Sequence, residues 1–397
     1  MKLQKYKLGE LLDVKRGASL TGEYYATSGN YIRLTCGNFD YKNNSFKINT
    51  SKDDLHYTGP VNDEFIMKRG DIITPLTEQA IGLLGSTAII PEDNKYIQSQ
   101  DVAKIICKES VLHPMYAFYL ISSETVKRQL SVAAQQTKIR HTSPDKIKDC
   151  VVWIPDLEEQ KRIASILSAL DNKIALNHEI NQNLEAMAKL LYDYWFVQFD
   201  FPNEEGKPYK SSGGKMVWNE KIKREIPIGW DNCTLKDFLT IKNGRDHKYL
   251  SEGLYPVYGS GGEMRRVNEY LYKGESVLMP RKGTLNNIMY VDESFWTVDT
   301  MFYSEMKVLH CAKYIFFAIK DIDFTRWDSG TGVPSMTAST LYNLPMIKPN
   351  IDLLKRFDKA ITPIFYKMKQ IRVEYEVLTK QRDELLPLLM NGQITIE

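Results

Sequence analysis

The stretch WIPDLEEQKRIASILSALDNKI, Trp153 to Ile174, returns in altered form as IKPNIDLLKRFDKAITPIFYKM, Ile347 to Met368. The two copies start from Pro155 and Pro349, which lie 194 residues apart. In both copies a residue that can cap a helix follows the proline, and apolar residues then recur with a helical period. The sequence therefore predicts the same long helix twice, and this repeat decides the architecture.

Both predicted helices carry a heptad seam, in which mostly apolar residues alternate at spacings of four and three. The seam residues of the first helix are Ile163, Leu167, Leu170, Ile174, Asn177, Asn181, Leu184 and Leu191. Those of the second helix are Phe357, Ile361, Ile364, Met368, Ile371, Leu378 and Leu385. Two seams in one chain most simply pack on each other, with the two asparagines fixing the register. The alternative is that each helix lies on a globule of its own.

The segments between the helices are also repeated, since LGELLDVKRG (8–17) matches LKDFLTIKNG (235–244) and GDIITP (70–75) matches GESVLMP (274–280). Short apolar runs between turn residues predict mixed α+β globules. The predicted fold has two similar globular domains joined by two long antiparallel helices that form a coiled coil with pseudo-two-fold symmetry. From the first helix we expect the globules to lie about 48 Å apart, more than one turn of B-DNA. The predicted segments are 1–152, 153–198 (first helix), 199–229 (linker), 230–348 and 349–397 (second helix and tail).

Composition indicates a folded chain, because 43% of the 397 residues are hydrophobic. No signal peptide or apolar run long enough to span a membrane is evident, which predicts a cytoplasmic protein. The five scattered cysteines predict reduced thiols, and the six histidines show no metal-ligand spacing. Because the net charge is only +2, binding to nucleic acid can be inferred only from local clusters of basic residues.

Several features together resemble the specificity subunits of type I restriction-modification systems. They are the repeated helix start, IPIGW (226–230) before the second globule, the strand-glycine openings at Gly17 and Gly244, and the ending LLPLLMNGQI (385–394). One departure is Leu353-Leu354 in the second helix, where the first has Glu159-Gln160.

The resemblance implies that each globule is a target-recognition domain for one half of an asymmetric bipartite DNA target. It implies that the helices set the spacer and dock two methyltransferase subunits, and that restriction subunits join the full complex. S-adenosylmethionine is then expected on the methyltransferase subunits and no cofactor on this chain. The alternative is a coiled-coil scaffold whose two globules bind proteins.

No catalytic motif stands out in the sequence. There is no Pro-Pro dipeptide of the kind that amino-methyltransferases use and no GxxxxGK[ST] phosphate loop. The residue types of a metal-dependent nuclease motif occur in PDLEEQK (155–161), but they are too closely spaced and lie at the predicted start of a helix. We therefore expect a non-catalytic, metal-free chain.

Loops that combine cations, amides and aromatic residues are the candidates for DNA contact. In the first globule the candidates are Lys15, Arg16, Arg33, Gln135, Gln136, Lys138, Arg140 and His141. In the second globule they are Arg245, His247, Lys248, Arg265, Arg266, Arg281, Lys282 and Arg326. For any one of them a solvated surface position is an equally good interpretation.

Overall fold

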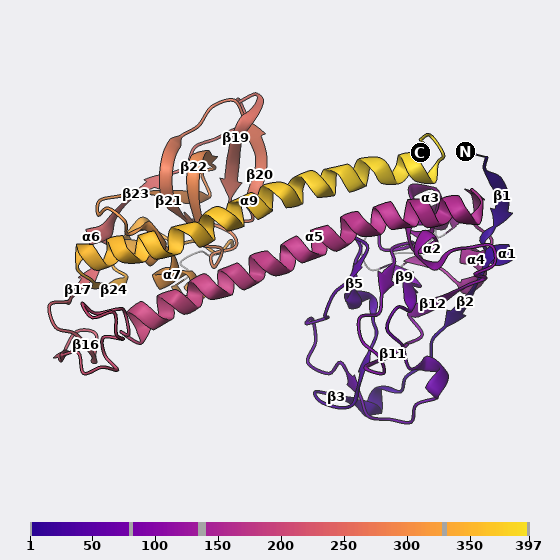
Figure 1. The fold of residues 1–397 in the computed structure, drawn as a ribbon, viewed down its shortest axis with the longest axis horizontal. Helices are drawn as coiled ribbons and strands as arrows, with labels where there is room; N and C mark the ends of the chain where they lie inside the picture. The colour runs from indigo at the N-terminus through magenta and orange to yellow at the C-terminus, as the bar shows by residue number, and fades with distance from the viewer. Residues whose placement is uncertain (1, 79–81, 134–139, 328–331, 395–397) are drawn as a thin grey trace. The chain divides into compact units, whose positions relative to one another are not determined.

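The structure, a computed structural model, describes residues 2–78, 82–133, 140–327 and 332–394 (Figure 1). The chain forms two compact units, of which the first comprises Met1–His178 with Val373–Glu397 and the second comprises Glu179–Arg372. The boundaries fall within the two long helices, α5 (Leu157–Tyr192) and α9 (Ile351–Met390). Each unit therefore contains a globule, part of α5 and part of α9.

The first unit is built on a four-stranded sheet in the order β10-β8-β12-β2 and a second one in the order β11-β4-β7-β3. The first sheet consists of β10 (Ala88–Ile89), β8 (Ile72–Pro75), β12 (Val102–Cys107) and β2 (Leu12–Arg16). The second consists of β11 (Tyr96–Ile97), β4 (Tyr31–Arg33), β7 (His56–Tyr57) and β3 (Tyr25–Ala26). The two-stranded pairs are β1 (Gln4–Lys7) with β14 (Val151–Ile154), β5 (Phe39–Asp40) with β6 (Ser45–Phe46), and β9 (Thr77–Glu78) with β13 (Arg140–His141). The helices of this globule are α1 (Leu8–Leu11), α2 (Pro114–Ile121), α3 (Glu124–Ala133) and α4 (Pro144–Lys148).

The second unit has one six-stranded sheet in the order β18-β23-β21-β22-β19-β20. Its strands are β18 (Leu239–Asn243), β23 (Met301–Met306), β21 (Tyr272–Pro280), β22 (Met289–Thr297), β19 (Glu252–Gly259) and β20 (Gly262–Val267). The remaining pairs are β15 (Met216–Asn219) with β16 (Arg224–Pro227) and β17 (Asp231–Thr234) with β24 (Pro345–Lys348). The helices are α6 (Leu235–Phe238), α7 (Ala312–Lys320) and α8 (Ala338–Tyr342).

The two segments that are similar in sequence also have the same order of helices and strands. A one-turn helix leads directly into the strand that ends before Gly17 in the first unit and before Gly244 in the second. The strand order β8-β12-β2 returns as β21-β23-β18. In both units the strand before the long helix, β14 or β24, pairs with the strand that directly precedes the one-turn helix, β1 or β17. The predicted pair of similar α+β globules is thus confirmed.

The helix starts are capped as expected. Asp156 Oδ1 accepts a hydrogen bond from the backbone N–H of Glu159 at 3.0 Å, and Asn350 Oδ1 accepts one from Leu353 at 2.8 Å. Pro387 near the end of the second helix predicts a frayed end, because proline disrupts a helix. This prediction is wrong, because α9 continues to Met390. The side chain of Met390 is buried in the core of the first unit, and this packing holds the last turn.

Within each unit α5 packs antiparallel against α9. In the first unit Ile163 and Leu167 share a core with Leu389 and Met390, while further along α5 Lys173 pairs with Glu374 at 3.3 Å. In the second unit the end of α5 meets the start of α9, where the ring centroid of Tyr192 lies 6.4 Å from that of Phe357. Trp195, in the π-helical turn Asp193–Val197 after α5, lies 5.6 Å from the same ring. Every residue of the predicted seam is buried or partly buried.

One expected helix is divided. The sequence predicts a single helix from Pro114 to Leu130, but α2 ends at Ile121 and α3 begins at Glu124. The hydroxyls of Ser122 and Ser123 donate to backbone carbonyls of α2, at 3.1 Å to Phe118 and 2.6 Å to Leu120. Serine competes in this way for backbone groups, which favours a helix end at this point.

Candidate nucleic-acid interface

In each globule one strand, β2 or β18, ends immediately before a glycine that packs against backbone. A Cβ on Gly17 would overlap the carbonyl oxygen of Ser99, and a Cβ on Gly244 would overlap that of Val298. The next residue donates its N–H in both cases, Ala18 to Gln98 at 3.1 Å and Arg245 to Thr297 at 2.8 Å. These contacts bring the end of one strand against the turn that precedes another strand.

Two further loops are hydrogen-bonded to the segments around this glycine, and the hydrogen bonds are equivalent in the two units. In the first unit Leu76 N–H donates to Asp101 O at 2.8 Å, and Thr142 N–H donates to Leu76 O at 2.9 Å. In the second unit Arg281 N–H donates to Thr300 O at 2.9 Å, and Met336 N–H donates to Arg281 O at 2.8 Å.

We call each such set of four segments a loop frame. The loop frame of the first unit consists of 16–18, 76–78, 98–102 and 140–142, and that of the second unit consists of 243–245, 281–283, 297–301 and 334–336.

The loop frame of the second unit is rich in cations. Arg245, Arg281 and Lys282 all expose their side chains. The guanidinium carbon of Arg281 lies 6.0 Å from the ring centroid of the buried Phe302. Within the described ranges, no carboxylate forms an ion pair with any of these three cations. This arrangement presents three basic groups from sequence-distant loops, as an anion-binding surface requires.

The loop frame of the first unit has a different chemistry at the corresponding places. Thr77 Oγ1 lies 3.3 Å from both Asp101 Oδ1 and His141 Nδ1, so a threonine hydroxyl joins an acid and an imidazole. Arg16 Nε donates to the backbone oxygen of Gln100 at 2.8 Å, which ties that cation to the frame. The side chain of Arg140 lies outside the described residues, although its backbone pairs with Glu78 in β13.

Two of the arginines predicted to contact DNA are engaged within the protein. Arg33 is 7% exposed, lies 3.8 Å above the ring of Tyr25 and donates to Asp54. Arg265 donates to Nδ1 of His247 and to the backbone oxygen of Leu250. Both arginines hold a loop in place, and Arg265 also fixes the orientation of the predicted His247.

The remaining residues predicted to contact DNA lie at the surface or outside the described residues. Lys15 Nζ lies 3.9 Å from Glu64, Arg266 pairs with Glu263 at 3.0 Å, and Arg326 pairs with Asp323 at 3.2 Å. Lys248 is exposed. Gln135, Gln136 and Lys138 fall outside the described residues.

Sequence reasoning missed Thr77 and Asp101, which the fold brings to the loop frame. A signal for Thr77 was present, because alignment of GDIITP with GESVLMP places Leu76-Thr77 against Arg281-Lys282. No sequence pattern pointed to Asp101, because only the pairing of β12 with β8 brings this residue beside Thr77.

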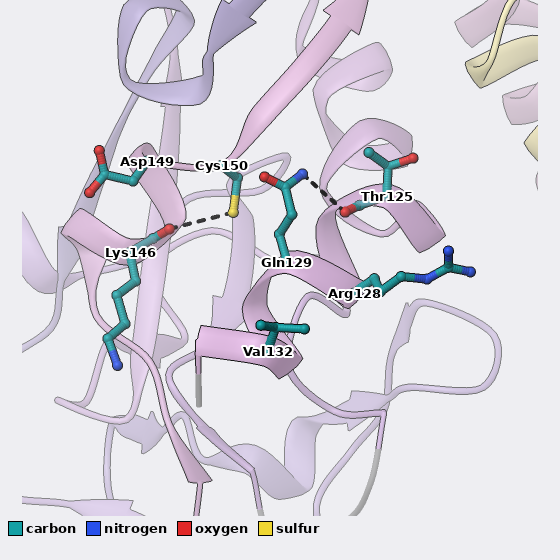
Figure 2. Close-up of a pocket in the computed structure, with 7 residues that line it drawn as sticks. All are labelled: Thr125, Arg128, Gln129, Val132, Lys146, Asp149 and Cys150. Carbon is teal, nitrogen blue, oxygen red and sulfur yellow. Dashed lines mark hydrogen bonds between the residues drawn. The ribbon is translucent and has the colours of Figure 1, made fainter. Parts of the chain in front are cut away.

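A pocket in the first unit offers polar groups but no activated nucleophile (Figure 2). Gln129 binds both backbone groups of Val151 at 2.8 Å and so ties α3 to β14. Arg128 and Lys146 point away from each other at its edge (Figure 2). Burial raises the pKa of the Cys150 thiol to about 11, so the weakly nucleophilic neutral form dominates at neutral pH.

Neither a metal-binding group nor a membrane-spanning helix is found in the described part of the chain. No set of three or more His, Cys, Asp or Glu residues there is arranged to hold a metal ion. None of the described helices combines the length and the apolarity needed to cross a bilayer.

The long helices also expose apolar side chains to solvent. In the second unit Met187 and Leu190 of α5 are 57% and 65% exposed, and Tyr366 of α9 is 63% exposed. In the first unit Leu176, Val373 and Val377 are about half exposed. Met187 and Leu190 are three residues apart and so lie on one face of α5. Contiguous apolar patches are typical of surfaces that bind other protein chains.

Comparison with known proteins gives a consistent result. The family model described as "Type I restriction modification DNA specificity domain" matches residues 2–186 and 227–371. The chain is 23% identical to the HindI specificity subunit of Haemophilus influenzae, over 98% of this chain and 99% of that one. It is 25% identical to the MjaIX specificity subunit of Methanocaldococcus jannaschii, over 77% and 74% respectively. The crystal structure of a type I S subunit from M. genitalium shares the fold with a TM-score of 0.67 at 18% identity, covering 98% of this chain and 96% of that one.

Proposed function

Because the chain belongs to the family of type I restriction-modification DNA specificity proteins, we propose that each of its two units reads one half of a bipartite DNA target. The observation that carries this proposal is the loop frame, which occurs once in each unit with the same backbone hydrogen bonds. The side chains on the two frames differ, so the two half-sites differ and the complete target is asymmetric.

The chain contributes recognition, and the chemistry belongs to its partners. Methyltransferase subunits dock on the long helices, where apolar side chains such as Leu190 and Tyr366 are exposed. S-adenosylmethionine binds to those subunits, and restriction subunits join the complex for cleavage. The family membership supports this division of labour.

The direct test is the binding of duplex DNA by the full chain together with its methyltransferase partners. A randomised duplex pool is incubated with the complex at several salt concentrations, and the bound fraction is sequenced. We expect a bipartite motif, and we expect log K to fall with log salt by about 0.9 for each phosphate contact.

The control is the methyltransferase subunit without this chain, which we expect to select no motif. Binding that depends on this chain but selects no sequence would contradict the proposal. That outcome would favour a scaffold whose globules bind proteins.

A further inference from the structure

Arg281 and Lys282 of the second unit occupy the places that Leu76 and Thr77 hold in the first. The equivalence rests on the backbone, since the N–H and the C=O of Arg281 form the same two frame hydrogen bonds as those of Leu76. Lys282 forms an antiparallel bridge with Ser335, and Thr77 pairs in the same way with His141.

The side chains at these two places face different surroundings. Leu76 is 2% exposed and belongs to the core of the first unit, whereas Arg281 is exposed. Thr77 is 8% exposed and bonds Asp101 and His141, whereas Lys282 is exposed and has a glycine next to it.

The backbone of Arg281 is held at both its N–H and its C=O, and its guanidinium lies near the ring of Phe302. The frame also carries the exposed Asp299, beside Thr300. In the described part of the chain this carboxylate forms no ion pair with Arg281. A guanidinium that is held at its base and extends into solvent can bind the edge of guanine through two parallel hydrogen bonds.

We propose that Arg281 reads a guanine in the half-site bound by the second unit, and that Lys282 and Arg245 bind the flanking phosphates. This inference rests on the proposed function. It identifies the residue that determines which base is recognised at one position of one half-site. The first unit has no cation at the places of Arg281 and Lys282. The corresponding position of the first half-site is therefore recognised without an arginine-guanine pair.

The test replaces each residue by the one that the first unit has at the same place. Arg281→Leu and Lys282→Thr are prepared in the full chain with its methyltransferase partners, and Arg281→Lys is added to keep the charge but remove the two-pronged donor. Lys273→Thr is the matched control, because Lys273 is exposed near the start of β21, whereas Arg281 directly follows the end of that strand. Thermal unfolding verifies that every variant is folded.

We expect Arg281→Leu and Arg281→Lys to reduce discrimination at a single base pair of the second half-site by about tenfold to a hundredfold. Lys282→Thr should leave every base preference intact and reduce the salt slope by about one. Lys273→Thr should change neither quantity.

Two outcomes overturn the inference, and they can be told apart. If the wild-type complex selects a bipartite motif but both Arg281 variants keep all preferences of the second half-site, the inference fails and the proposed function stands. If the wild-type complex selects no motif, both fail together.

Discussion

At the scale of single residues, Gly17 and Gly244 are the positions on which both loop frames depend. They directly follow β2 and β18, and in each case the carbonyl oxygen of another segment occupies the place that a Cβ would take. Neither glycine needs a left-handed backbone, so the requirement for glycine is purely one of space.

Gly244→Ala should therefore destabilise the second unit. The added methyl group must displace the turn that holds Arg245 and Arg281, and overpacking of this kind costs about 1–3 kcal/mol of unfolding free energy. Urea unfolding of the full chain measures the loss. Gly261→Ala is the control, because a Cβ at Gly261 would meet nothing within 4 Å. Equal stability of the two variants would contradict the close-approach argument.

Sequence reasoning at this scale succeeded where the repeat gave two copies to compare. It located both glycines and the cations of the second loop frame. It could not foresee that Arg33 is buried, because its partners Tyr25 and Asp54 reach it only through tertiary contacts. The DNA contacts assigned to single residues stay predictions.

At the scale of elements, an ionic network around the buried Lys313 joins the sheet of the second unit to α9. Lys313 of α7, whose side chain is 5% exposed, donates to Glu275 of β21 at 2.6 Å and to Asp358 of α9 at 2.7 Å. His310 also bonds Asp358, at 2.8 Å. Burial by itself would raise the pKa of the Asp358 carboxyl, but the hydrogen bonds from Lys313 and His310 outweigh it and hold the pKa below its ordinary value of 3.8.

Lys313→Met should cost about 3 kcal/mol of unfolding free energy at pH 7, because it leaves two partly buried carboxylates without their cation. A carboxyl whose pKa is lowered by folding contributes stability above its unfolded pKa and loses it as the pH falls. The difference between wild type and variant should therefore shrink as the pH falls below about 4.

Urea unfolding at several pH values measures this effect. Lys207→Met is the control, because the ion pair of Lys207 with Glu205 is exposed and should be worth less than about 1 kcal/mol. A loss that stays constant from pH 7 to pH 3 would refute the assignment to Asp358.

The long helices were the elements best predicted from the sequence, because a heptad period and a capping residue are local signals. Both caps are confirmed. The strands of the first unit were less predictable, since several have only two residues and exist through pairing with distant partners, as β9 does with β13.

At the scale of the whole molecule, the internal repeat predicted the architecture and the family. Recognition of an asymmetric target requires two globules that share a backbone plan but differ in the side chains that they present. The units differ most in the second sheet of the first globule and in the β19–β20 hairpin of the second, segments in which no repeat could be found. The spacer that the helices set stays a prediction, because the distance between half-sites is a property of the DNA-bound complex.

The most direct test of the central claim is to map DNA methylation in a host strain that carries this chain with its methyltransferase subunit. We predict one asymmetric bipartite motif with a fixed gap, which disappears when the chain is deleted. In the Arg281→Leu strain we predict that the motif relaxes in one half only. A motif that persists without the chain, or a variant that alters both halves equally, would contradict the account of two independent reading units.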